Sequence, residues 1–177
     1  MPYSTLHKGR PTTQCLAGRA PFLTLLVTVF MTVLVASMTD ANEKPAVQPH
    51  FSKAYIDLDW GQMHLLQAIP ELMTQPTLVC FPPNPFSGNY YRQLMTRLAV
   101  DRRVVALDYP GLGQSDASAT WRTIGDLAEL MIDAIESAHL TGGHHPSVDV
   151  CGYHTGAMVA AEVAIRRPDL VRQVILI

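Results

Sequence analysis

The sequence predicts an α/β fold: a mostly parallel open sheet with an antiparallel hairpin at its N-terminal side. Three observations lead to this prediction. Short continuous apolar runs alternate with amphipathic segments of helical period over residues 77–177. Such runs are typical of parallel strands buried on both faces by the helices that connect them. Ahead of them, two runs of alternating apolar and polar residues meet at Trp60 and Gly61, as in a hairpin.

The first elements are the hairpin and two buried strands. The hairpin is predicted over residues 52–60 and 61–69, and the first buried strand over 77–81, "TLVCF". A helix is predicted over 87–99, because Tyr90, Leu94 and Leu98 recur at helical spacing. The second buried strand lies in "RRVVALD", residues 102–108.

The second half repeats the strand and helix pattern. An amphipathic helix is predicted over 123–140, with Gly142 and Gly143 ending it. A third buried strand over 147–152 leads into a helix from residue 155 that Pro168 stops. A fourth buried strand begins at residue 170, and the sequence stops on its apolar run. We therefore expect the sheet to be truncated.

The N-terminal region carries an export feature. Residues 20–38 hold no charge, with Lys8, Arg10 and Arg19 before them and acidic residues after them. This order predicts a signal peptide or an uncleaved N-terminal membrane anchor over residues 1–41, with a buried helix less favoured. Residues 42–50 are predicted to be a linker and 51–177 the folded domain. That domain is expected to be exported (periplasmic or secreted), or anchored outside the cytoplasm.

Composition excludes several classes of partner. The net charge is -2 and no long basic run occurs, so no nucleic acid partner is expected. No metal is expected, because neither H-E-x-x-H nor paired cysteine spacing is present, and "GLGQSD" lacks the residues of phosphate and dinucleotide loops. No cofactor is therefore expected. Cys80 and Cys151 lie in apolar runs and are interpreted as buried, with a disulfide between them allowed on export.

Three loops follow the buried strands and should meet at one edge of the sheet. They are "PPNPFSG", "DYPGLGQSD" and "YHTGA". The second resembles the D-x-P-G-x-G-x-S stretch of the α/β-hydrolase fold superfamily, and "GYHTG" resembles its nucleophile elbow. "PPNPFSGNYYRQL" resembles its oxyanion loop, and "AYIDLDWGQMHLLQAI" its opening hairpin. The resemblance covers residues 54–177, so residues 51–177 are expected to be the N-terminal portion of an α/β-hydrolase domain.

The resemblance implies a hydrolase of a small ester, amide or related bond, acting on a small-molecule substrate. In the elbow, His154 stands where the family has Ser. The backbone N–H groups of Asn84 and Thr155 are the implied oxyanion donors, because Pro82 and Pro83 have no N–H. The family's acid and base would come from loops after later strands, beyond residue 177.

Three roles for His154 remain open at this point. The imidazole could attack directly, or act as a general base on water. Alternatively the site is inactive, and the chain is a binding protein or the remnant of a hydrolase. The hydroxyls of Thr155 and Ser115 are less favoured nucleophiles, and Ser115 is expected to make local hydrogen bonds in a turn.

Overall fold

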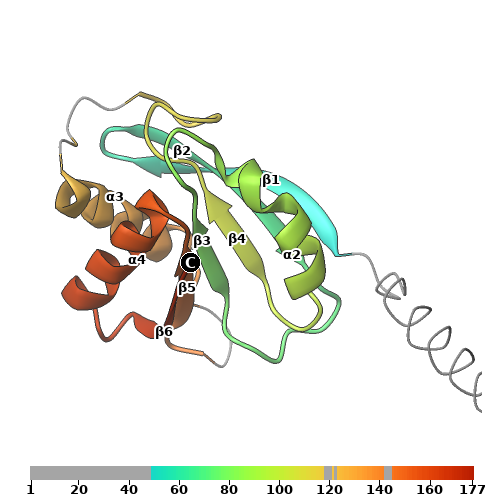
Figure 1. Ribbon diagram of the computed structural model, residues 1–177. Coiled ribbons are helices and arrows are strands. Elements are labelled where there is room, and N and C mark those ends of the chain that lie inside the picture. Colours follow the sequence, from blue (N-terminus) through green and yellow to red (C-terminus); the bar gives the residue numbers. More distant parts are fainter. Residues whose placement is uncertain (1–48, 118–120, 122, 142–144) are drawn as a thin grey trace, which may run out of the picture. The chain divides into compact units, whose positions relative to one another are not determined.

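The computed structural model describes residues 49–117, 121, 123–141 and 145–177, and Figure 1 shows their arrangement. Six strands form one sheet in the order β1-β2-β4-β3-β5-β6. Their bounds are β1 (His50–Leu58), β2 (Gly61–Ile69), β3 (Leu78–Phe81), β4 (Val104–Leu107), β5 (Val148–Gly152) and β6 (Val171–Leu176). Strands β3 to β6 are mutually parallel, and the β1–β2 hairpin is antiparallel. The predicted fold class is confirmed.

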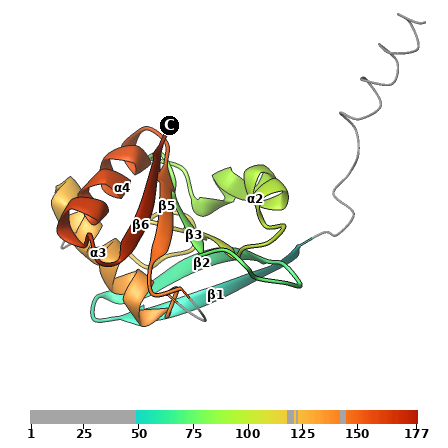
Figure 2. The ribbon, with the colours of Figure 1, turned by 90° about the horizontal axis from the view of Figure 1, so that it is seen from below.

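Helices cover both faces of the sheet. They are η2 (Gly88–Tyr91), α2 (Arg92–Leu98), α3 (Ile124–Ser137) and α4 (Thr155–Arg166). One face is covered by α2 and the other by α3 and α4, as Figure 2 shows from below. The strands between these layers therefore need apolar side chains on both faces, which is why they appear in the sequence as continuous apolar runs.

The core is divided by the sheet into two clusters. Along β3, Val79 and Phe81 face the cluster on the side of α3 and α4, whereas Leu78 and Cys80 face the cluster beneath α2. Every residue of β3, β4 and β5 is buried. This alternation follows from the two-residue period of a strand. It determines which side chains of each strand pack on each face of the sheet.

Two helix boundaries differ from the sequence prediction. The segment predicted as one helix over 87–99 begins with the 3-10 turn η2 before α2 starts at Arg92. The helix predicted to end at Gly142 and Gly143 instead ends at Ser137, and His139 adopts a left-handed backbone with φ 46°. A left-handed residue after the last turn ends a helix whether or not it is glycine, so the glycine pair was the wrong signal.

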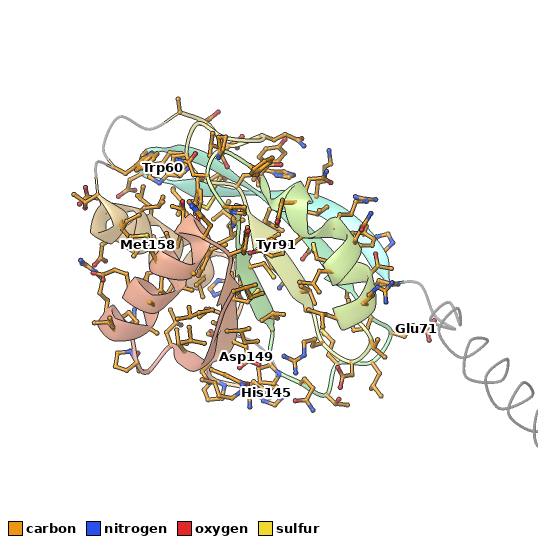
Figure 3. All side chains as sticks on the ribbon, in the orientation of Figure 1. Trp60, Glu71, Tyr91, His145, Asp149 and Met158 are labelled. Atoms are coloured by element: carbon orange, nitrogen blue, oxygen red, sulfur yellow. The ribbon has the colours of Figure 1, made fainter. Side chains whose placement is uncertain are left out.

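A buried carboxylate lies near the amino end of the parallel strands. Asp149 of β5 is 1% exposed, and its oxygens accept hydrogen bonds from Arg102 at 2.9 Å and from Arg172 at 2.8 and 2.6 Å. Figure 3 places it beside His145, which precedes β5. His145 thus lies at the opposite end of the sheet from the loops that follow β3, β4 and β5.

The predicted signal peptide or anchor lies outside the described residues. Within the described ranges, no helix has both the length and the apolar content needed to cross a bilayer. Export therefore remains a prediction from residues 1–41. N-terminal sequencing of the chain recovered from expressing cells checks it: a new N-terminus near residue 42 is expected after cleavage. An intact N-terminus on a chain in the soluble cytoplasmic fraction would contradict both the signal and the anchor.

Candidate active site

The turn between β5 and α4 holds His154 in an unusual backbone conformation. Strand β5 ends at Gly152 and α4 begins at Thr155, so the chain reverses within two residues. His154 has φ 54° and ψ -116°, a region that costs a non-glycine residue about 1–3 kcal/mol. Its side chain is exposed at the carboxyl edge of the sheet. The turn resembles a nucleophile elbow, in which a strained turn presents one side chain outward, and residues 152–156 are called the elbow below.

The two glycines of the elbow are required by close backbone contacts. A Cβ atom on Gly152 would lie 2.0 Å from the carbonyl oxygen of Gly156. A Cβ atom on Gly156 would lie 1.9 Å from the carbonyl oxygen of Phe81, the last residue of β3. Both distances are far below van der Waals contact. The first turn of α4 therefore packs directly on the end of β3, which brings the elbow next to the loop that follows β3.

The predicted oxyanion donors lie on these two adjacent segments. Asn84 is an exposed residue of the loop after β3, and Thr155 is the first residue of α4. In the described part of the chain, neither backbone N–H donates a hydrogen bond. Unpaired N–H groups at a helix start carry partial positive charge and favour an anion. Within the described residues, the N–H groups of Asn84 and Thr155 are thus unpaired.

The His154 imidazole has one polar side-chain partner among the described residues. Its Nδ1 lies 3.1 Å from Thr155 Oγ1, and its ring is tilted on Tyr153 with centroids 6.4 Å apart. No carboxylate and no second imidazole of the described ranges contacts it. Nor do three or more acidic, histidine or cysteine side chains of these ranges converge as metal ligands.

Aromatic side chains flank the elbow on the side of α2. Tyr153 stacks on Tyr90 with centroids 6.0 Å apart and planes 6° from parallel, and Phe86 packs against Tyr90 at 5.5 Å. Tyr91 lies between α2 and the sheet in Figure 3, where its hydroxyl donates to Phe81 O at 2.9 Å. Burial raises the pKa of the Tyr91 phenol well above its usual range, so it stays a donor. The carbonyl that Gly156 approaches is thereby held in place.

Sequence reasoning missed the network around Asp108, which follows β4. Its carboxylate accepts from Gly88 N–H at 2.6 Å and from Gln114 N–H at 2.9 Å, and lies 2.9 Å from Nδ1 of the buried His64. A Cβ atom on Gly113 would lie 1.9 Å from this carboxylate. The network joins the β4 loop to the start of η2, which follows the oxyanion loop. The only sequence signal was the Asp that opens "DYPGLGQSD".

Ser115 is committed to the same network. Its hydroxyl donates to the carbonyl of Asp108 and accepts from the N–H of His64, both at 2.9 Å. The predicted local hydrogen bond is present as the bond to Asp108, whereas the bond from His64 joins the loop to β2. The Ser115 hydroxyl therefore both donates and accepts a hydrogen bond within this network.

The architecture of the elbow agrees with what the chain is similar to. Residues 76–174, more than half of the chain, match a family described as the thioesterase domain. The chain belongs to the thioesterase domain family. Its fold is that of the α/β-hydrolases. It superimposes on a bacterial membrane phospholipase A with a TM-score of 0.64 and 22% identity, over 87% of this chain and 49% of that one.

The chain is also similar to two named enzymes. The thioesterase domain from the curacin biosynthetic pathway superimposes with a TM-score of 0.60 and 21% identity, over 72% of this chain and 46% of that one. An (E)-2-((N-methylformamido)methylene)succinate hydrolase of Acinetobacter baylyi is 33% identical over 70 residues, 40% of this chain and 25% of that protein. The chain spans a quarter to about a third of the length of the curated relatives it matches.

The close approach at Gly156 gives a stability prediction. Gly156→Ala places a methyl group against the Phe81 carbonyl, and we expect it to lower the free energy of unfolding by about 3 kcal/mol. Gly111→Ala is the matched control, because its Cβ would meet only Ala117 Cα at 3.9 Å and only its φ of 78° is unfavourable. We expect the control to lower the free energy of unfolding by about 1 kcal/mol. Urea unfolding measures both, and equal losses would contradict the steric account.

The Asp108 network gives a second prediction. Asp108→Asn removes the negative charge that faces three N–H donors. The new amide N–H₂ group then faces one of these donors, where an acceptor is needed. We expect it to lower the free energy of unfolding by about 3 kcal/mol. Asp116→Asn is the control, because Asp116 is exposed and accepts one N–H, from Gln62 at 2.9 Å. We expect Asp116→Asn to lower the free energy of unfolding by less than about 1 kcal/mol. A loss at Asp108 no larger than at Asp116, measured by urea unfolding, would show that the network does not stabilise the fold.

Proposed function

We propose that the chain is part of a hydrolase that cleaves a thioester, ester or amide bond of a small molecule at the His154 elbow. The observation that carries this proposal is the exposed imidazole on a strained turn, beside two unpaired N–H groups on adjacent segments. Membership of the thioesterase domain family supports the reaction class, as do the hydrolase names of the relatives.

His154 is the proposed nucleophile. If Nδ1–H donates to Thr155 Oγ1 across 3.1 Å, the lone pair of Nε2 is left outward and free to attack. Attack on the substrate carbonyl forms a C–N bond and places negative charge on the carbonyl oxygen. The N–H groups of Asn84 and Thr155 would donate to that oxygen, and the positive end of α4 would stabilise it.

Collapse of this intermediate breaks the bond to the leaving thiolate, alkoxide or amine. The acyl group remains on Nε2 as an acyl-imidazolium, which passes its Nδ1 proton to the leaving group and becomes a neutral acyl-imidazole. Water then adds to the acyl-imidazole, the C–N bond breaks, and the carboxylic acid departs with His154 restored. The net reaction consumes one water and yields one acid and one thiol, alcohol or amine.

General base catalysis by the same lone pair is the second mode. In that mode Nε2 takes a proton from water, which attacks the carbonyl, and no bond forms between protein and substrate. The rival function is non-catalytic binding at this edge of the sheet. It is favoured by one observation: in the described ranges, no carboxylate orients the His154 ring.

Hydrolysis of activated acyl compounds by purified His154→Ala tests the proposal. We expect the chain to hydrolyse p-nitrophenyl acetate and acetyl-N-acetylcysteamine, and the variant to lose about 100-fold or more in kcat/KM. His139→Ala is the matched control, because His139 is also exposed and also has a positive φ, 46°. The control should retain the parent rate. A nonspecific reaction of surface imidazoles with the activated ester would instead lower the rate equally in both variants.

Equal rates for the parent chain and His154→Ala would overturn the enzyme proposal and leave the binding function. Rapid acid quench followed by mass spectrometry of the elbow peptide separates the two catalytic modes. An acetyl group on His154 during turnover supports attack, and turnover without an adduct at any quench time supports general base catalysis.

A further inference from the structure

Cys80 and Cys151 face each other across two neighbouring strands. They are register partners in the parallel pairing of β3 with β5, although 71 positions separate them in the sequence. Cys151 Sγ–H donates to Cys80 Sγ at 3.1 Å. Both side chains belong to the apolar cluster beneath α2 and are 0% and 2% exposed. Both thiols are free.

The backbone geometry at this pair suits a covalent bridge. Neighbouring strands lie about 4.8 Å apart, which falls within the range of about 4.4–6.8 Å for Cα atoms joined by a disulfide. The sulfurs need to approach by about 1 Å to reach a bond length of about 2.05 Å. Rotation about the Cα–Cβ bonds of the two cysteines changes this sulfur–sulfur distance.

We propose that Cys80 and Cys151 form a structural disulfide that ties the strand ending in the oxyanion loop to the strand ending in the His154 elbow. In the reaction, two S–H bonds break, two protons and two electrons leave, and one S–S bond forms. The oxidant is a small-molecule disulfide, which is reduced to two thiols. The proposal is independent of the proposed function, because it concerns only the two sulfurs and the stability of the sheet.

The surroundings favour a structural bond over a reactive thiol pair. The hydrogen bond that Cys80 shares with Cys151, together with burial, favours the protonated form and raises the pKa of the Cys80 thiol well above its usual range. A buried protonated thiol is a poor nucleophile. The side chains of Tyr91 and Met95 cover the cluster from above, so a dissolved oxidant reaches the sulfurs during folding rather than in the finished fold.

The bridge would also close a long loop. Between the two cysteines the chain passes through α2, β4 and α3 before it returns to the neighbouring strand. Joining positions so far apart removes much of the conformational freedom of the unfolded chain. The folded sheet already holds the two sulfurs 3.1 Å apart. A large gain in stability on oxidation follows.

Refolding in glutathione buffers tests this inference. The full chain carrying Cys15→Ser, which leaves two thiols, is equilibrated with graded ratios of oxidised to reduced glutathione, in native buffer and in denaturing urea. Acid-quenched samples are scored by thiol counting and by intact mass, which falls by two hydrogens on bridging. We expect the effective concentration of the pair to be about 1000-fold higher in native buffer than in urea.

Thermal unfolding supplies the second readout. We expect the oxidised chain to melt about 10 °C above the reduced one, and Cys80→Ser and Cys151→Ser, each in the Cys15→Ser background, to show no dependence on oxidation. The proposal fails if both thiols stay free in native buffer where a control dithiol is fully oxidised. It also fails if the effective concentration is the same in urea or if the melting temperatures coincide.

Discussion

The contact between the first turn of α4 and the end of β3 is the constraint on which the rest of the site depends. Gly156 lies so close to the Phe81 carbonyl that no side chain fits between them. The contact forces the elbow and the β3 loop into one small region, and it sets the direction in which α4 leaves the sheet. The position of His154 at the start of α4, beside the end of β3, follows from it. Tyr91 holds the same carbonyl from the other face of the sheet.

Most of the fold could be predicted because each central strand is buried on both faces. A doubly buried strand is apolar at nearly every position, and β3 and β4 are short runs of this kind. In β5 the exception is Asp149, whose buried carboxylate is paired with two arginines. The helix ends were harder to predict. At the end of α3 the left-handed position falls on His139, whereas sequence reasoning assigned it to a glycine pair. A local backbone choice of this kind depends on what packs around the turn, and the sequence does not record it.

The site, like the fold, has one part that could be predicted from the sequence and one part that could not. The elbow is local in sequence, so its two glycines and the central residue could be recognised from spacing. The Asp108 network could not, because His64, Gly88 and Gln114 come from separate segments that meet only in the folded sheet. Its part is to hold the loop after β4 against the start of η2, and so to limit how far the neighbouring oxyanion loop can move. The loops beside the elbow are therefore held by hydrogen bonds that the sequence pattern does not reveal.

The pairing of β3 with β5 also has a consequence for how the protein folds. The hairpin β1–β2 pairs residues close in sequence and can form early, whereas β3 and β5 meet only after the intervening segments have been arranged. During synthesis β3 leaves the ribosome well before β5, and until β5 arrives its edge is available to other partners. The elbow and the oxyanion loop are assembled in that late step. The site is thus absent from partly folded chains, and it exists only in molecules whose central sheet is complete.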